Sequence, residues 1–241
     1  PPQYGKVFIS IKPRNGDFVP NLIKENIKRD LRKYSVAGIV PEILDLKYLF
    51  IETNSKVYYN TNLAPNASFV STKVQRDLTS YAESSELNKY GARFKYSRFL
   101  KVIDSSHESV TSNITTVEMR RDLRLATSEV AEYAIDFGNE FHVQSMNGFN
   151  IRSSAFRVLN INTDVYLYDI PDSSAEKGQI SLFSLDEGSS TPVIQRANIG
   201  VIDYKKGRIT LDPINIVSGK TKDNVDILEI SATPESNDII G

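Results

Sequence analysis

The sequence contains no cysteine and only two histidines among its 241 residues. The absence of cysteine excludes disulfide scaffolds, thiolate zinc sites, iron–sulfur clusters and cysteine nucleophiles. It leaves the compartment undecided, although it suits a reducing cytosol. Because His107 and His142 stand alone, a histidine-rich metal site or proton relay is excluded, while a single catalytic histidine stays open.

Long apolar runs and a targeting signal are also lacking. No stretch of about 18 apolar residues occurs, and the start at Pro1 shows neither an initiator Met nor a signal-peptide pattern. We therefore expect a soluble chain that is a piece of a longer protein. At about 150 residues per domain, its length predicts one large domain or two modest ones.

A surplus of either charge is missing from the whole chain but not from its halves. The net charge is −1, which argues against a protein whose main partner is a phosphate backbone. Residues 1–125 carry 20 Lys and Arg against 13 Asp and Glu, and residues 126–241 carry 9 against 17. Opposite poles of this kind either orient head-to-tail contacts between copies or lie on solvated faces.

The first half alternates strand and helix patterns. Residues 5–12 have the period-two alternation of a strand, and an amphipathic stripe follows from near Pro20-Asn21 to near Gly38. This stripe consists of Ile23, Ile27, Leu31 and Tyr34. Residues 43–52 return to strand periodicity, and Asn54-Ser55 predicts a turn into another strand. The expected order is strand, helix, strand, strand.

Two further helices and a strand complete this half. Thr72 and Gln75 have the spacing of a capping box before a second helix. After Gly91, a third helical stripe contains Tyr96, Phe99, Leu100 and Ile103, and residues 114–119 predict a strand.

The second half consists of short β-rich stretches separated by turn residues. They begin after Phe141 and cover residues 151–159, 165–170, 179–185, 193–203, 208–211 and 225–231. The clearest feature is a hairpin over residues 200–211, in which Gly207 supplies the positive φ that a tight turn needs. The pattern predicts an antiparallel sandwich or barrel.

Together these patterns predict an α+β protein. We expect an N-terminal α/β layer of strand-helix-strand-strand type with covering helices over residues 1–125, followed by an antiparallel β domain over residues 126–241.

Motifs that carry chemistry are weak. Gly219-Lys220-Thr221 is similar to the end of a phosphate-binding loop, but Ile214 stands where its first glycine belongs and no helix is expected after Thr221. We therefore expect an exposed turn there.

Acidic turn residues offer oxygen ligands for a hard cation but lack the spacing of an EF-hand. They are Asp186, Glu187, Asp223 and Asp226, with Gly188 in the first turn. His107 has no nucleophile or orienting group identifiable beside it. Asn66 and Asn113 begin glycosylation triplets that we interpret as chance matches. We predict no catalytic, cofactor-binding or metal-binding residue.

Residues 93–101 interleave basic and aromatic side chains, a pattern that can hold phosphates and stack bases. The helical spacing instead favours a buried stripe, with Lys95, Arg98 and Lys101 on a solvated face. Nucleic-acid binding through this segment is kept as an alternative.

Several strings together resemble a known family. They are residues 5–13 with the amphipathic helix that follows, the strand 42–51, Gly91 with Phe94, Ser97, Phe99 and Leu100, and the hairpin from Ile202 to Leu211. The first half resembles the baseplate J-like proteins of contractile-tailed phages. The whole chain resembles the carboxy-terminal portion of the inner baseplate wedge subunit of T-even-type phages.

This resemblance implies a structural protein of the virion, located in the tail baseplate after assembly in the host cytoplasm. It implies homodimerisation and contacts with other wedge subunits, in an inner ring around the tail hub that rearranges to trigger sheath contraction. It offers no catalytic residue and implies no cofactor, nucleic-acid or membrane partner.

A carbohydrate- or receptor-binding β module of a virion is the other alternative. It requires an exposed aromatic cluster in the second half, for which Tyr166, Tyr168 and Tyr204 are the available side chains.

Overall fold

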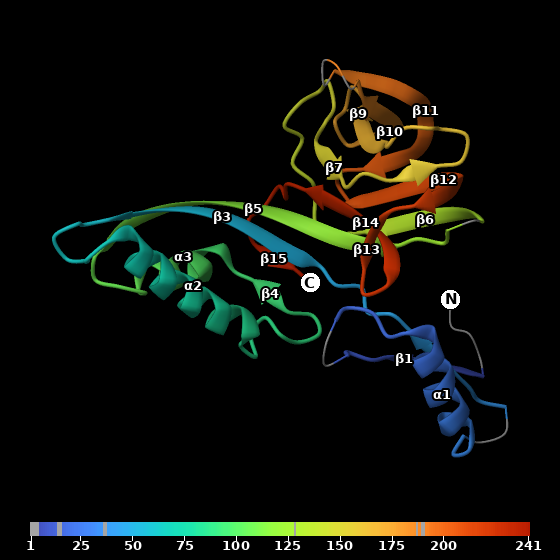
Figure 1. The fold of residues 1–241 in the computed structure, drawn as a ribbon, viewed down its shortest axis with the longest axis horizontal. Helices are drawn as coiled ribbons and strands as arrows, with labels where there is room; N and C mark the ends of the chain where they lie inside the picture. The colour runs from blue at the N-terminus through green and yellow to red at the C-terminus, as the bar shows by residue number, and fades with distance from the viewer. Residues whose placement is uncertain (1–4, 14–15, 36–37, 128, 187, 189–190) are drawn as a thin grey trace.

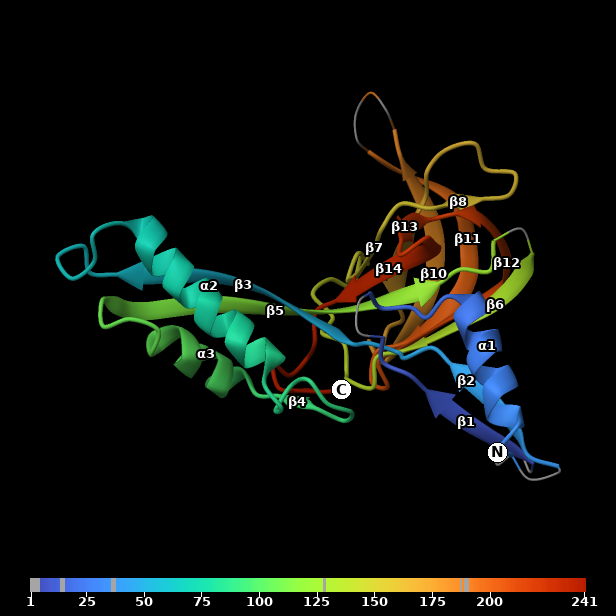
Figure 2. The ribbon, with the colours of Figure 1, turned by 60° about the horizontal axis from the view of Figure 1, so that its bottom comes forward.

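The computed structural model describes residues 5–13, 16–35, 38–127, 129–186, 188 and 191–241. Its elements form three regions (Figure 1). We call residues 5–44 the N-terminal unit, residues 50–118 the arm, and residues 130–240 the β body. In both views the arm extends to the left of the β body, and the N-terminal unit lies at the lower right (Figures 1 and 2).

The N-terminal unit is a small strand-helix-strand unit. Strands β1 (Lys6–Ser10) and β2 (Val40–Leu44) pair in parallel, and α1 (Asn21–Arg32) is the connection between them. Parallel strands need such a crossover because a tight turn cannot join them. The predicted helix and the first predicted strand are found, although α1 ends at Arg32 rather than near Gly38.

The predicted strand 43–52 is wrong as a single element. Strand β2 ends at Leu44 and β3 (Phe50–Tyr59) begins six residues later. Between them, Arg121 donates from Nη1 to the backbone oxygens of Lys47 (2.8 Å) and Tyr48 (3.4 Å). A side chain therefore occupies acceptors that a neighbouring strand would otherwise use.

The turn predicted at Asn54-Ser55 is also wrong, because β3 continues through it. Strand β3 pairs with β5 (Val110–Arg124) from Phe50 to Tyr59. The hydroxyls of Ser55 and Thr115 lie 2.8 Å apart across this ladder. Cross-strand pairing thus outweighs the local turn preference of the two polar residues.

The arm consists of the β3–β5 ribbon and two helices that cover one of its faces (Figure 2). Helix α2 (Ala67–Glu83) begins five residues before the predicted capping box at Thr72, because the Asn66 side chain accepts the Phe69 N–H at 2.8 Å. Helix α3 (Tyr96–Asp104) confirms the predicted third helix, with Phe99 and Ile103 buried.

The β body holds most of the remaining strands, and an antiparallel sheet in the order β6-β12-β11-β10-β9 forms much of it. Its strands are β6 (Val130–Asp136), β9 (Tyr166–Pro171), β10 (Lys177–Leu185), β11 (Pro192–Asp203) and β12 (Arg208–Ser218), with β8 (Arg157–Val158) on β12. The predicted hairpin is confirmed, with Gly207 at φ 62°. Strand β6 was not predicted, although Ala131, Tyr133 and Ile135 recur at every second position.

The second sheet, which we call the central sheet, joins the two halves of the chain in the order β13-β14-β5-β3, with β7 on β14. Its remaining strands are β7 (Ile151–Ser153), β13 (Lys220–Lys222) and β14 (Val225–Ala232), while β15 (Ile239–Ile240) pairs with β4 (Arg93–Phe94) of the arm. The turn expected at Gly219–Thr221 is wrong, because Lys220 and Thr221 lie in β13. The turn follows at Asp223-Asn224, both with positive φ.

One buried apolar cluster runs from the arm into the β body and contains no residue of the N-terminal unit among those described. The structure is therefore α+β with a β-rich second half. The expected boundary at 125/126 falls between β5 and β6, and the division into two domains stays a prediction. Among the described residues, no helix has the length and hydropathy to cross a membrane.

Candidate assembly surfaces

A network of charges attaches the N-terminal unit to the central sheet. Lys222 on β13 contacts Asp122 on β5 at 2.8 Å and Asp17 of the N-terminal unit at 2.5 Å. Burial alone would lower the pKa of Lys222, but hydrogen bonds to the two carboxylates outweigh it and raise that pKa. Asp223 completes the link by accepting the Asp17 N–H at 2.8 Å.

Three more charged or polar contacts lie at the N-terminal end of α1. Asp45 lies 2.6 Å from Lys24 on α1 and 3.0 Å from Arg124 on β5. Arg124 also donates to the side chain of Asn21 at 3.1 Å. The N-terminal unit lies outside the main apolar core, and these charged and polar contacts attach it together with Phe18 and Val19, which are buried.

Many apolar side chains of the N-terminal unit are exposed, although Phe18 and Val19 are buried and Ile27 and Leu31 are half-buried. Helix α1 has no buried residue, and Leu22, Ile23 and Tyr34 are 74%, 47% and 88% exposed. On β1, Val7 and Phe8 are about half exposed. The predicted amphipathic stripe is therefore not buried within the chain. Apolar side chains gathered on one small unit mark a surface that a partner covers.

The arm offers a second open surface, which consists of the ribbon face that the helices leave free and the edge formed by β3. Strand β3 is an edge strand, because it pairs with β5 alone among the described strands. Ile114 on β5 is 62% exposed, and its partner across the ladder is Lys56. Long exposed edges of this kind are available for pairing with another chain.

An aromatic cluster lies on the β body, where the binding-module alternative requires one. Phe149 contacts Tyr168 with ring centroids 4.4 Å apart, and Phe183 packs against Phe149, Tyr166 and Tyr168. Phe149 is half exposed and has φ 64°, an uncommon value for an aromatic residue. Tyr204, in contrast, is 1% exposed and cannot belong to a binding surface.

The two histidines lie in separate settings. The His107 Nδ1 is 2.9 Å from the Ser109 hydroxyl in the α3–β5 loop, and its ring packs edge-on against Phe69. His142 pairs through Nδ1 with Glu235 at 2.6 Å on the surface. The structure thus gives His107 a local serine contact and His142 an exposed glutamate.

The basic-aromatic segment 93–101 directs its rings inward. Phe94 and Phe99 are buried against each other, and the Tyr96 hydroxyl donates to the Thr115 oxygen at 2.8 Å. Lys95, Arg98 and Lys101 are exposed, as predicted. Because the rings are packed or hydrogen-bonded, they are not free to stack on bases as nucleic-acid binding requires.

The remaining motif residues have structural contacts. Lys220 pairs with Glu229 at 2.7 Å, and Asn113 donates to Asp104 at 2.7 Å. Of the acidic turn residues, Asp223 receives the Asp17 N–H and Asp226 lies 3.5 Å from the Thr221 hydroxyl, while Glu187 lies outside the described residues. Within the described part of the chain, no three His, Asp or Glu side chains are placed to hold a metal ion.

Sequence reasoning missed the charged residues that join the regions. Arg120 contacts Glu52, Asp122 and Glu229 at 2.6–2.9 Å, and Asp122 is 3% exposed. The available signal was the high density of charged residues in 118–124 inside a β pattern, because charged residues on both faces of a strand are unusual in a covered sheet.

Comparisons with known proteins agree with a structural role. Residues 1–44 match the family model described as baseplate structural protein gp6, C-terminal domain I, and residues 47–122 match C-terminal domain III of the same protein. The chain is 29% identical over 172 residues to the baseplate wedge protein gp6 of Enterobacteria phage T4. This alignment covers 69% of the chain and 26% of the relative, so the chain spans about a quarter of that protein's length.

The two matched segments coincide with regions of the structure. The first ends where β2 ends, and the second begins just before β3 and includes the arm. The similarity supports a baseplate wedge subunit's carboxy-terminal portion, although it does not confirm the baseplate J-like family. The sequence and the fold thus point to a structural component of a phage tail baseplate, which is part of the virion.

Proposed function

We propose that this chain is the part of a baseplate wedge subunit that holds neighbouring subunits together. In this proposal it dimerises, contacts other wedge subunits, and contributes to an inner ring around the tail hub that rearranges to trigger sheath contraction. The proposal includes no enzymatic activity, cofactor, nucleic acid or membrane. In this proposal the N-terminal α/β layer over residues 1–125 and the β-rich domain over residues 126–241 stay joined by their shared sheet and core when neighbouring subunits bind.

The observation that carries the proposal is the state of the N-terminal unit. Its helix buries no side chain, so a large apolar surface faces solvent in the isolated chain. A partner subunit that covers this surface gains about 25 cal/mol for each Å² of apolar area removed from water.

The way the unit is attached supports the rearrangement. Its connection to the sheet rests on Lys222, Asp122, Asp17 and Asp45 rather than on the main core. These ion pairs are partly buried, so breaking them has a cost, but their exchange does not require the apolar core of the β body to open.

Light scattering at high micromolar concentration tests the dimer. We expect the purified chain to form dimers, and Leu22→Glu to shift the population toward monomer by placing a charge in the apolar surface. The matched control is Leu159→Glu, because Leu159 is 53% exposed on the β body. A wild-type chain that stays strictly monomeric contradicts dimerisation, and equal effects of both variants contradict this choice of surface.

A further inference from the structure

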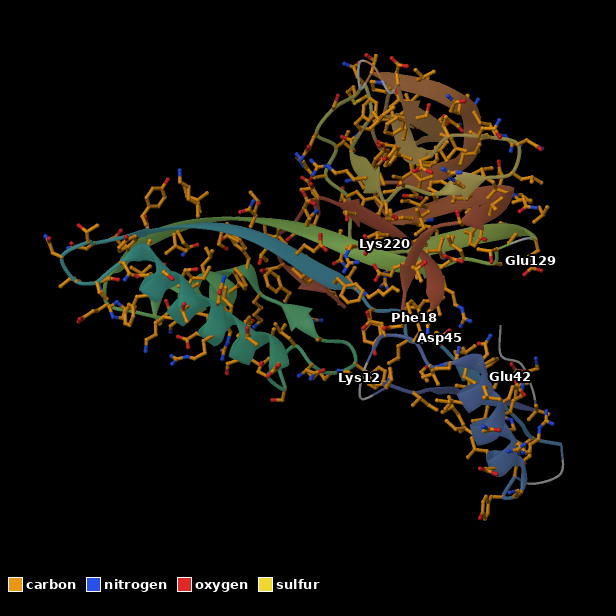
Figure 3. The ribbon with its side chains drawn as sticks, in the orientation of Figure 1. Lys12, Phe18, Glu42, Asp45, Glu129 and Lys220 are labelled. Atoms are coloured by element: carbon orange, nitrogen blue, oxygen red, sulfur yellow. The ribbon has the colours of Figure 1, made fainter. Side chains whose placement is uncertain are left out.

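A cleft of about 700 Å³ lies where the three regions meet. Its walls include Phe18 and Leu46, the β5 residues Arg121–Arg124, and the β6 residues 134–136. Phe18 of the N-terminal unit and Asp45, the residue after β2, both line the cleft and lie on the side of that unit that faces the central sheet (Figure 3). This volume is within the range of clefts that hold ligands or side chains of a partner.

Two cations that line this cleft form no ion pair among the described residues, the exposed Lys47 and the half-buried Arg121. Among the described residues, Arg121 forms no ion pair within 4.0 Å, whereas its neighbours Arg120 and Arg124 both do. Arg121 donates only to backbone oxygens, and its Nε is buried with no hydrogen-bond partner. Burial lowers the pKa of this guanidinium although Asp136 lies nearby. A desolvated cation without a counterion is costly, so the site favours an anion.

The other charges of the cleft limit how much negative charge it accepts. Asp45, Asp122 and Asp136 also line it, and they are paired with Arg124, Lys222 and Arg208. These carboxylates repel a polyanion such as a nucleic-acid backbone, while one carboxylate beside Arg121 is compensated. Lys47 is the other cation of the wall and is exposed, so the chemistry fits a carboxylate on the half-buried Arg121 rather than a polyanion.

The cleft is also bordered by two sheet edges. Strand β5 pairs with β14 through Arg124, but its pairing with β3 ends at Arg120. Strand β6 pairs with β12 alone among the described strands. Backbone groups at such edges bind an extended chain, and pockets beside the edge select its side chains.

We propose that this cleft binds an extended segment of another protein, with a carboxylate on Arg121 and apolar side chains against Phe18 and Leu46. The inference does not depend on dimerisation, because it concerns a different surface and a partner of different chemistry.

Nuclear magnetic resonance with two short peptides tests the proposal. The probes are Ac-Leu-Asp-Leu-NH₂ and its uncharged match Ac-Leu-Asn-Leu-NH₂, added to the ¹⁵N-labelled chain. We expect the Asp peptide to shift the Arg121 Nε–H signal and to bind roughly tenfold tighter than the Asn peptide, as a charged hydrogen bond in a partly dry site provides. Arg121→Gln removes this preference, while the exposed-arginine control Arg152→Gln retains it.

A second pair of variants keeps the test valid if Arg121→Gln folds poorly. Ala134 is an exposed wall residue on β6. Ala134→Glu supplies an internal carboxylate and abolishes the preference, whereas Ala134→Gln has the same size and leaves it intact. Three results overturn the proposal. The first is equal binding of the two peptides, and the second is displacement of the Asp peptide by a thymidine oligonucleotide. The third is no binding of either peptide at about 10 mM, which is weaker than short ligands reach in a formed site.

Discussion

Tyr204 and Asp169 form a buried polar group at the centre of the β body. The Tyr204 hydroxyl donates to Asp169 Oδ2 at 2.6 Å, and Asp169 also accepts from the Asn150 side chain at 2.8 Å and the Ile151 N–H at 2.9 Å. Both Tyr204 and Asp169 are at most 1% exposed. Satisfied networks of this kind fix one arrangement of the surrounding strands.

The protonation of Tyr204 gives a pH dependence with a definite sign. Burial, followed by the hydrogen bond to Asp169 and its charge, raises the pKa of Tyr204 far above that of a free tyrosine. Above about pH 10, the unfolded chain releases this proton and the folded chain keeps it. The folded state then binds more protons, so the free energy of unfolding falls as pH rises.

Tyr204→Phe tests this dependence. We expect the variant to lose about 2 kcal/mol of stability at neutral pH, where the hydrogen bond to the carboxylate is lost. Above pH 10, its stability decreases less steeply than the wild type's, by up to about 1.4 kcal/mol per pH unit. Urea unfolding at a series of pH values measures both quantities, and identical alkaline slopes contradict the assignment.

At the scale of elements, strand β13 holds the N-terminal unit through one lysine. Lys222 is flanked by Asp122 and Asp17, and its ammonium lies 4.8 Å from the centre of the Phe50 ring. Removing the charge leaves Asp122, which is nearly inaccessible to solvent, with Arg120 alone.

We expect Lys222→Met to release the N-terminal unit more often without unfolding the β body. Thermolysin then cleaves within residues 5–49 roughly tenfold faster, because the loss of a partly buried ion pair lowers the free energy of local opening. Lys206→Met is the control, since Lys206 is an exposed hairpin residue. Cleavage that begins in the β body, or at equal rates in both variants, argues against the attachment described above.

The sequence predicted elements whose cause is local and missed those whose cause is distant. Helix α3 and the Gly207 hairpin follow from spacing and backbone conformation within about a dozen residues. The break after Leu44 depends on Arg121, and the attachment of the N-terminal unit depends on Lys222, which lies 100 residues from its partner Asp122. No local pattern records such pairings.

The candidate surfaces were predictable in kind but not in position. The stripe Ile23, Ile27, Leu31 and Tyr34 was visible, yet periodicity alone does not tell whether a face is covered by the same chain or by another. Arg121 likewise looks like its neighbours in the sequence. Only the three-dimensional arrangement separates the arginine without a carboxylate from those that have one.

For the whole molecule, the unequal charge of the two halves has a measurable consequence. The first 125 residues carry a surplus of positive charge and the remainder a surplus of negative charge. If the poles orient copies in an assembly, raising NaCl from about 50 to 500 mM weakens self-association severalfold, because the Debye length falls well below the distance between poles. Sedimentation velocity measures the change, and salt-independent association assigns the interface to apolar contacts.

Strand β5 gives the molecule different resistance to force in different directions. It runs from the arm into the central sheet, where six residue pairs from Met119 to Arg124 join it to β14. A pull on the arm along β5 loads these pairs in shear, so they must yield together. A pull on the N-terminal unit instead meets a few ion pairs that yield one after another. Under tension the N-terminal unit therefore detaches at a lower force than the arm.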